Sequence, residues 1–329
     1  MDSGVDERGK VMTALICGSM AYDTVMVFEG RFREHILPDR IHMLNVSFLA
    51  PSMRRNFGGC AGNIAYNLKL LGSDGLIMAT VGHDFAPYEA VLVERGIALT
   101  HVRKIESEFT AQAYITTDLD DNQITAFHPG AMNHSHLNVV SSARDTKLGI
   151  VSPDGRQGMI EHTAQFAAAG IPFMFDPGQG LPMFNGEELR DLVSQATWVA
   201  VNDYEASMLT ERTGWSLKEI AAKTKALIVT RGAEGSWIFA DGRRQDIPAA
   251  KAAQLADPTG CGDAYRAGLL FGLQRGFDWP TTGRIASLAG AIKMEHHGTQ
   301  HHHYDQASFA ARYRQSFGQS FGHSFGATP

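Results

Sequence analysis

The chain has 329 residues, of which 44% are hydrophobic and 19% are charged, as in an ordinary globular protein. The formal net charge of −6 at pH 7 argues against nucleic acid as the main partner, because phosphate binding relies on clustered Lys and Arg. Three cysteines form no disulfide framework and fit a reducing compartment. No apolar run reaches membrane-spanning length, and residues 1–12 contain no apolar signal segment. We therefore expect a cytoplasmic protein with neither nucleic-acid nor membrane partners.

The first eighty residues mix a buried core pattern with exposed β-segments. The apolar run Ala14–Cys17 predicts a short buried strand. Alternating stretches at 24–28 and 44–48, separated by charged or Pro-containing turns, predict exposed antiparallel strands. A helix is predicted over 63–71, where apolar side chains recur on one face, and a buried strand over 76–81. Exposed β-structure is thus expected between elements of a buried core.

A second exposed β-segment follows. Residues 111–117 and 123–127 alternate in polarity and flank the turn-forming sequence Asp-Asp-Asn at 120–122, which predicts a hairpin. We expect the two exposed regions, at about 23–53 and 109–130, to form one small β-sheet by two separate insertions into a larger domain.

From residue 147 onward, apolar strand patterns alternate with amphipathic helix patterns. The predicted strands are 148–151, 172–175, 198–201 and 227–230, and the predicted helices are 157–169, 204–212, 263–274 and 281–295. This alternation predicts a single α/β domain over 1–329, with a central, mostly parallel sheet flanked by helices. After a helix near 308–315, the tail repeats Ser-Phe-Gly three times, and residues 316–329 are expected to be flexible. Partner binding by the tail phenylalanines is the alternative.

The strongest chemical motif is residues 256–264, ADPTGCGDA, which runs directly into an apolar helix. Glycines at a helix start let backbone amides converge on an anion, aided by the positive end of the helix dipole. Asp263 would stand beside that anion and can take a proton from a hydroxyl that attacks a phosphoryl group. The amides of Gly260, Cys261 and Gly262 would then stabilise the phosphoryl oxygens. The alternative is that Asp263 only favours the helix dipole, and spacing alone leaves both interpretations open.

The second motif is residues 56–63, NFGGCAGN, again leading into a helix. Its small residues permit close approach of a ligand to the backbone, and the Asn63 amide offers a donor and an acceptor for sugar hydroxyls. A tight turn in which Asn63 caps the helix is the alternative. This motif is weak by itself.

Five motifs in order carry a family resemblance. They are Gly18 to Asp23, Gly58-Gly59 to Asn63, Asn202 to Glu205, Thr230 to Gly232, and Asp257 to Asp263. In their order and separation the chain resembles the ribokinase/PfkB carbohydrate kinases over roughly residues 15–300. The resemblance implies a ribokinase-like α/β fold whose small β-sheet is a lid. It also implies an ATP-dependent kinase. The chain contains no Walker A motif, which disfavours a P-loop kinase.

The resemblance also implies roles for individual residues. Asp263 matches the catalytic base, and the amides of Gly260, Cys261 and Gly262 match the anion hole. The expected substrate-binding residues around the sugar are Asp23, Gly58, Gly59 and Asn63. The ATP-binding residues are expected to be Asn202, Thr230, Gly232 and Gly235. Asn202 and Glu205 match an Asn-x-x-Glu motif that holds Mg²⁺ largely through water, which suits an ion that keeps several waters. Asp257 and the carbonyl of Thr259 match part of a monovalent-cation (K⁺) site.

The phosphoryl acceptor is less firmly indicated. Residues 123–132 and 295–300 resemble the prokaryotic nucleoside kinases of this family more than ribokinase. A nucleoside needs an apolar slot for its base. Candidate lining residues are Phe109, Gln112, Tyr114, Phe127 and Met132. Packing within the small sheet is the alternative role for these side chains. The expected reaction is phosphorylation of a nucleoside 5′-hydroxyl, with purine nucleosides such as inosine, guanosine and adenosine preferred.

Other functions stay open. The chain is alternatively a kinase of a free sugar such as ribose or fructose, or a non-catalytic sugar- or nucleoside-binding regulator. The small molecules are the expected partners, and the protein is expected to be a monomer or a homodimer formed through the lid. Cys60 and Cys261 are most simply small residues in place of Ala, although Cys261 at a helix start invites the hypothesis of a reactive thiolate. The histidines at 296, 297 and 301–303 lack the companions of a zinc set.

Overall fold

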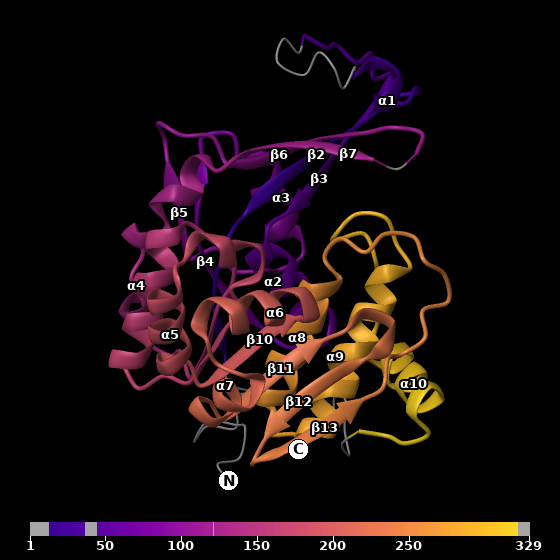
Figure 1. Cartoon of the computed structure of the whole chain (residues 1–329). Coiled ribbons are helices and arrows are strands. Elements are labelled where there is room, and N and C mark those ends of the chain that lie inside the picture. Colours follow the sequence, from indigo (N-terminus) through magenta and orange to yellow (C-terminus); the bar gives the residue numbers. More distant parts are fainter. Residues whose placement is uncertain (1–12, 37–44, 121, 322–329) are drawn as a thin grey trace.

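Short strands that are apolar on both faces form the centre of the molecule. Each of these strands is covered by other parts of the chain on both faces. The computed structural model describes residues 13–36, 45–120 and 122–321. Within them, nine strands form one sheet in the order β13-β12-β11-β10-β9-β8-β1-β4-β5 (Figure 1). The strands are β1 Ala14–Cys17, β4 Gly75–Gly82, β5 His101–Ile105, β8 Leu148–Val151, β9 Phe173–Phe175, β10 Trp198–Asn202, β11 Ala226–Thr230, β12 Ser236–Ala240 and β13 Arg243–Ile247. Only β12 and β13 run antiparallel to their neighbours.

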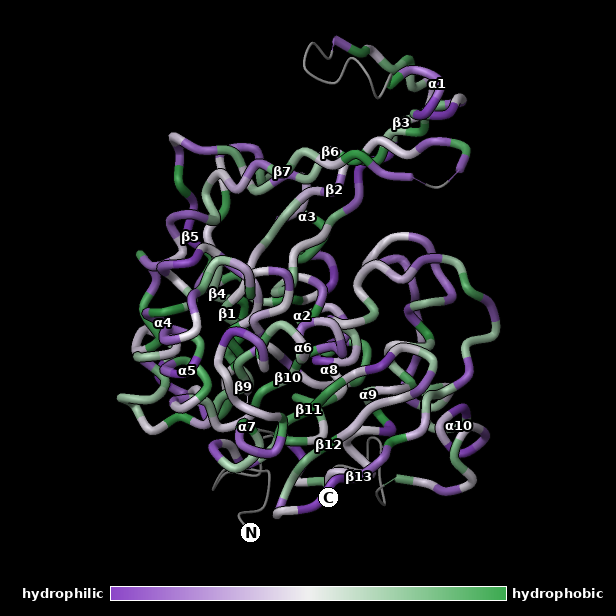
Figure 2. The backbone as a smooth tube through the Cα atoms, in the orientation of Figure 1, coloured by the Kyte–Doolittle hydropathy of each residue, from purple (hydrophilic) through white to green (hydrophobic). Residues whose placement is uncertain are grey.

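Helices cover both faces of this sheet. Along β1, Ile16 contributes to the core on one face and Cys17 to the core on the other, as the period of two requires. The first face is covered by α2 Cys60–Leu70, α3 Ala86–Glu94, α8 Cys261–Gln274, α9 Trp279–Met294 and α10 Gln306–Phe317. The second is covered by α4 Arg156–Ala168, α5 Gly186–Gln195, α6 Asp203–Thr213 and α7 Leu217–Lys223. Figure 2 shows the buried strands β10 and β11 as hydrophobic segments. The expected α/β fold is confirmed.

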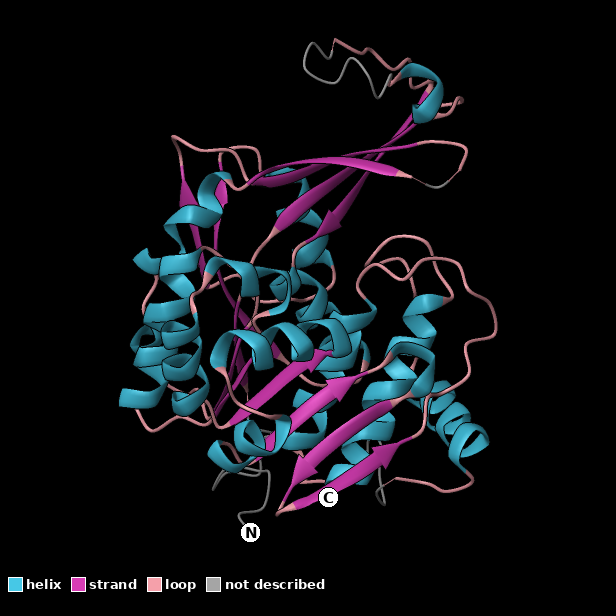
Figure 3. Cartoon of the chain, viewed as in Figure 1, coloured by secondary structure: helices cyan, strands magenta, loops and turns pink. Residues whose placement is uncertain are grey.

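A second, four-stranded sheet stands apart from the first (Figure 3). Its order is β3-β2-β6-β7, with β2 Ala21–Val27, β3 Ser52–Gly58, β6 Ala111–Thr117 and β7 Gln123–His128. β2 leaves directly from the carboxyl end of β1, so this sheet rises from the edge where the parallel strands end. The remaining elements are the short helix α1 Phe32–His35 and the 3₁₀ turns η2 Gly130–Leu137, η3 Val140–Ser142, η4 Gly178–Met183 and η5 Gly232–Glu234.

The strand predicted at 44–48 is wrong. Residues 45–48 form no regular structure, and Leu44 lies outside the described residues. The partner of β2 is instead β3, in which Asp23 pairs with Asn56. The first half of β3 is exposed and carries Arg54 and Arg55. Backbone ladder bonds rather than side-chain burial define it, so no apolar pattern marked it.

The tail is packed farther than expected. Helix α10 continues to Phe317 and ends at Gly318, and Phe321 is buried against Tyr313 with ring centroids 4.4 Å apart. Residues 316–321 thus include packed positions, and residues 322–329 lie outside the described part. No helix within the described ranges combines the length and apolar character that crossing a membrane requires.

The pairing of α8 with α9 depends on Gly268. A Cβ at this position would lie 2.4 Å from the Cα of Ala286, which leaves no room for any side chain. We expect Gly268→Ala to lower the free energy of unfolding by about 2 kcal/mol through overpacking. Gly290→Ala is the matched control, because its Cβ would meet only the Cys261 carbonyl at 3.4 Å. Urea denaturation of both variants measures the difference, and equal midpoints would contradict the packing argument.

Candidate active site

The loop before α8 is shaped to leave backbone amides open at the start of the helix. Gly260 adopts the left-handed conformation with φ of +81°, and the helix starts at Cys261. A Cβ at Gly262 would meet no atom within 4 Å, so this side of the helix start is open. The amide of Cys261 donates to the Pro258 carbonyl at 3.1 Å, whereas the sequence had suggested it for the anion hole.

Asp263, in the first turn of α8, is partly buried and has an Asn side chain as its partner. Asn63 Nδ2 donates to Asp263 Oδ2 at 2.8 Å. Removal from water raises the pKa of Asp263 to about 6, the Asn63 hydrogen bond opposes this, and the negative charge of Asp176 adds to it. The carboxylate is therefore mostly ionised at neutral pH yet more basic than an exposed Asp, as a proton acceptor requires.

The orientation of Asn63 is determined by a chain of buried hydrogen bonds. Arg95, which can only donate, donates Nη1 to Gln300 Oε1 at 2.8 Å, so the Gln300 amide nitrogen faces Asn63. Gln300 Nε2 then donates to Asn63 Oδ1 at 3.0 Å. Asn63 is left with its own amide nitrogen toward Asp263. Asn63 and Gln300 are 3% and 2% exposed, so water does not compete for these contacts.

The predicted sugar-binding residues lie together beside this pair. Gly59 begins α2 with φ of +87°, and a Cβ there would collide with the Ser19 carbonyl at 2.5 Å. A Cβ at Gly58 would lie 2.6 Å from Asp23 Oδ2, so the Asp23 carboxylate rests on the bare backbone of β3. Burial, with a smaller contribution from the charge of Asp257, raises the pKa of Asp23 to about 6. Asp257, in the loop that precedes Asp263, thus affects the pKa of Asp23 through its negative charge.

The small sheet separates the predicted base-binding residues into two groups. Asp23 is in register with Ala113, and Ala113 with Phe127, so these side chains share one face. Gln112 and Tyr114 are on the opposite face. Gln112 is buried and bonded to Asp84, Arg55 and Tyr114. These two residues and Asp23 cannot meet one ligand across this sheet.

Two further predicted residues lie near the base of the small sheet. Met132 is half-buried in η2, and the neighbouring Ala131 amide donates to the Phe109 carbonyl at 2.9 Å. Phe109 is 49% exposed and its ring is 4.4 Å from that of His83. The structure thus joins the backbone of residue 131, next to Met132, to that of Phe109.

The predicted ATP-binding residues follow the carboxyl ends of two adjacent strands. Asn202 is paired with Thr230 across β10 and β11. Asn202 and Glu205 form a capping box on α6, with bonds of 2.7 Å and 2.8 Å. Gly232 and Gly235 have φ of +54° and +84°, and a Cβ at Gly232 would meet nothing within 4 Å. This edge of the parallel sheet is where α/β proteins bind ligands.

The sequence analysis did not predict a buried ion pair that affects both Asp263 and the ATP-binding residues. Arg266 donates to both carboxylate oxygens of Asp176 at 3.1 Å, and the two side chains are 5% and 7% exposed. Burial raises the pKa of Glu205, and Asp176 raises it further. Asp176 thus raises the pKa of both Asp263 and Glu205, which belong to different motifs. Two features of the sequence could have indicated this pair. Asp176 directly follows the strand β9, and Arg266 lies one turn beyond Asp263 on α8.

The residues of the expected monovalent-cation site are engaged with protein donors. Asp257 Oδ1 accepts from the Thr259 amide at 2.8 Å, and Oδ2 accepts from the Gly298 amide at 2.9 Å. The Asp257 carbonyl accepts from Lys293 Nζ at 2.7 Å. Of the expected ligands, Asp257 thus has its carbonyl bonded to a protein ammonium group and its carboxylate bonded to two backbone amides.

The two site cysteines are not activated. Burial raises the pKa of Cys261 to about 11 and raises that of Cys60 well above its ordinary value. This argues against the hypothesis of a reactive thiolate at Cys261, because the effect of burial on its pKa exceeds the opposing effect of the Lys293 charge. Of the histidine cluster, His302 is buried and contacts Asn67 Oδ1 at 2.8 Å.

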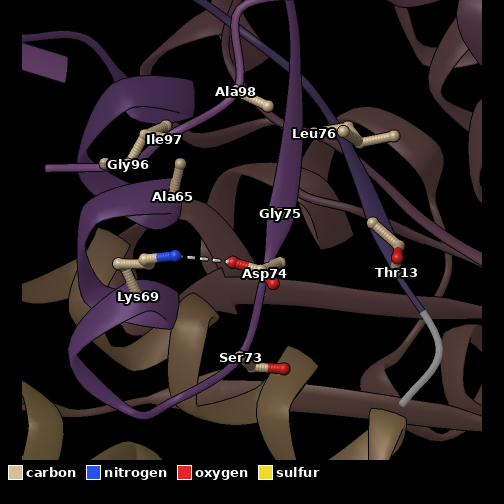
Figure 4. Close-up of a pocket in the computed structure, with 10 residues that line it drawn as sticks. All are labelled: Thr13, Ala65, Lys69, Ser73, Asp74, Gly75, Leu76, Gly96, Ile97 and Ala98. Atoms are coloured by element: carbon tan, nitrogen blue, oxygen red, sulfur yellow. Dashed lines mark hydrogen bonds and ion pairs between the residues drawn. The ribbon is translucent and has the colours of Figure 1, made fainter. Parts of the chain in front are cut away.

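A surface pocket elsewhere does not belong to this site. Figure 4 shows it between α2 and the amino end of β4, where Lys69 and Asp74 form an ion pair of 3.0 Å. It lies at the opposite edge of the sheet from Asp176 and Asn202.

Comparison with known proteins agrees with this geometry. The model of the pfkB family carbohydrate kinases matches residues 21–306, and the chain belongs to this family. A nucleoside kinase of Methanocaldococcus jannaschii is 32% identical over 259 residues, which cover 78% of this chain and 85% of that protein. The structure of Burkholderia thailandensis nucleoside kinase in complex with inosine is 54% identical, with a TM-score of 0.86, and the match covers 93% of this chain and 99% of that chain. The protein is an ATP-binding kinase, a phosphotransferase with an alcohol group as acceptor.

The hydrogen-bond chain predicts the titration of Asp263. In Gln300→Glu, the new carboxylate can only accept, so Asn63 must turn its amide nitrogen toward it and present Oδ1 to Asp263. We expect the pKa of Asp263 to rise above about 6, because the ionised form loses its donor. Carboxyl-carbon NMR titration measures this. Gln274→Glu, the same change at a buried glutamine bonded to Ser73, is the control. An unchanged Asp263 pKa in the first variant would refute the orientation argument.

Proposed function

We propose that this protein is an ATP-dependent nucleoside kinase that phosphorylates the 5′-hydroxyl of the nucleoside, with Asp263 as the base. The observation that carries the proposal is the Asn63–Asp263 hydrogen bond, which joins the sugar-binding motif to the anion-binding helix start across 200 positions of the chain. The M. jannaschii and B. thailandensis relatives, both nucleoside kinases, support the acceptor class.

Asp23, Ala113 and Phe127 share one face of the small sheet, and their spacing fits the size of a nucleoside. Asp23 and Phe127 lie on strands two apart, which places them roughly 10 Å from each other. Ala113, between them, has a small side chain. We assign the ribose hydroxyls to Asp23, Gly58, Gly59 and Asn63. We assign the base to Phe127, which is 50% exposed, together with Met132. The position of Gln112 and Tyr114 on the opposite face argues against their contacting the base.

The chemistry follows from this placement. Asp263 accepts the proton of the 5′-hydroxyl while that oxygen attacks the γ-phosphorus of ATP, and ADP leaves. Amides at the start of α8, chiefly those of Gly260 and Gly262, stabilise the charge on the transferred group. The ATP phosphates lie toward Asn202, Thr230, Gly232 and Gly235. Mg²⁺ would be held near Asn202 and Glu205 through water, and it would neutralise phosphate charge. The small sheet would act as a lid that excludes water.

Purine nucleosides are the proposed acceptors. The B. thailandensis enzyme has been solved with inosine and with ADP and inosine, in the latter case at 54% identity, a TM-score of 0.83 and coverage of 95% of this chain and 100% of that one. The flat, exposed ring of Phe127 suits stacking with a bicyclic base. A panel of inosine, guanosine, adenosine, cytidine, ribose and fructose tests the acceptor. Activity on free ribose or fructose alone would overturn the proposal.

Loss of the base should separate catalysis from stability. We expect Asp263→Asn to lower kcat about 1,000-fold with little change in nucleoside Kd. The raised pKa of Asp263 means that its ionised form is disfavoured in the folded state, at a cost present above pH 6 and lost below its ordinary value near 4. The variant should therefore be about 1 kcal/mol more stable at pH 7.5, allowing for partial solvent exposure, and equally stable at pH 3.5. Steady-state kinetics, calorimetry and urea denaturation check these outcomes, and an unchanged kcat would rule out Asp263 as the base.

The base-stacking assignment has its own test. We expect Phe127→Ala to raise KM for the nucleoside about tenfold and to leave KM for ATP unchanged, because one stacking contact is lost. Ile124→Ala is the matched control. It is on the same strand, 43% exposed, but on the other face of the sheet. Equal effects of the two variants would contradict the assignment.

A further inference from the structure

Lys293 is buried beneath the loop that leads to Asp263. It lies in the last turn of α9 and is 0% exposed. Its ammonium group donates to the Asp257 carbonyl at 2.7 Å and to the His296 carbonyl at 3.0 Å. Within the described residues these partners are backbone carbonyl oxygens rather than a carboxylate in direct contact. A fully buried cation is costly, so its retention here calls for a reason.

The surroundings supply a negative potential that suits one cation. The carboxyl end of α9 carries the negative end of its helix dipole. The Met294 carbonyl accepts the amides of Ala256 and Asp257, which ties the loop to this helix end. The Asp257 carboxylate accepts hydrogen bonds from the Thr259 and Gly298 amides. These bonds hold the loop before α8 next to the ammonium group. The two carbonyls that contact the ammonium are ligands of the type with which proteins hold K⁺.

The arrangement does not fit a second cation at the same place. The Asp257 carbonyl already serves the ammonium, and both Asp257 carboxylate oxygens already accept backbone amides. An ion bound to those oxygens would stand a few ångströms from Lys293, where like charges repel. Of the two residues matched to a K⁺ site, Asp257 therefore has every oxygen atom bonded to a protein donor.

We propose that the Lys293 ammonium is a built-in cation that takes the place of bound K⁺ and holds the loop of residues 256–262 in the form that presents its amides. Lys293 is thus a positioning residue, and the kinase works without K⁺. The inference rests on the kinase activity, and its failure is separable from failure of the proposed acceptor, because the phosphoryl acceptor plays no part in the cation site.

The first experiment replaces the cations of the assay. Activity of the wild-type enzyme is measured with the best acceptor of the panel and tetramethylammonium or KCl as the only monovalent salt, at constant ionic strength and Mg²⁺. We expect rates equal within about twofold and a Tm that does not depend on which salt is present. A saturable activation of the wild type by K⁺ would overturn the proposal. If no acceptor is phosphorylated, the Tm comparison still tests it, because a saturable rise of Tm in KCl alone would also overturn it.

The second experiment removes the ammonium. Lys293→Ala should lose about 100-fold in kcat in tetramethylammonium, because the loop shifts, and should regain most of it in KCl. Its Tm should rise with KCl and not with tetramethylammonium, as expected for an ion that fills the vacated space. Lys69→Ala, which breaks a surface ion pair with Asp74 far from the loop, should show neither effect. Full activity of Lys293→Ala without K⁺, or a loss that K⁺ fails to restore, would refute the role of Lys293. The wild-type comparison decides the question if this variant does not fold.

Discussion

The hydrogen bond between Asn63 and Asp263 is the contact on which the organisation of the site depends. Each residue lies in the first turns of a helix, α2 or α8, and each helix is preceded by a glycine with positive φ, Gly59 or Gly260. Two helix starts therefore converge on one space at the carboxyl edge of the sheet. Their positive ends favour an anionic phosphoryl group there. The Cys60 and Ala61 amides of α2 already donate to Ser19, so the open amides are those of α8. The Asn63 amide, held by Gln300 and Arg95, keeps the Asp263 carboxylate at the point where the two helices meet.

The charges around this point balance two opposing needs. A carboxylate that accepts a proton benefits from a raised pKa, and burial together with Asp176 raises that of Asp263 to about 6. Too much burial would keep it protonated. Arg266, which pairs with Asp176 and lies one turn beyond Asp263, lowers the Asp263 pKa and opposes this. Lys293 supplies positive charge on the far side of the loop. The site thus accepts some loss of folding stability in exchange for reactivity.

The elements that the sequence predicted best are those in which burial alone dictates the pattern. The strands at Ala14–Cys17 and Leu148–Val151 are buried on both faces, and a short apolar run is their signature. Strand β3 was missed because its first half is exposed. Alternation along β6 separates Gln112 from Ala113 but cannot tell which faces the ligand, because a shift of one residue exchanges the faces. Register with Asp23 decides that Phe127 is on the ligand side.

By itself the sequence determined the order of the motifs, the glycines that open two helix starts, and the strand–helix alternation that brings those starts to one edge of a sheet. These properties are local, because they depend on the conformations available to a few neighbouring residues. The roles of Gln300, Arg266 and Lys293 were decided only by the tertiary structure. Each of the three contacts a polar group that is distant in the sequence. Gln300 acts through the orientation of its side-chain amide, and Lys293 acts through one particular backbone carbonyl. Only the packing of α2, α8 and α9 determines which of these groups meet.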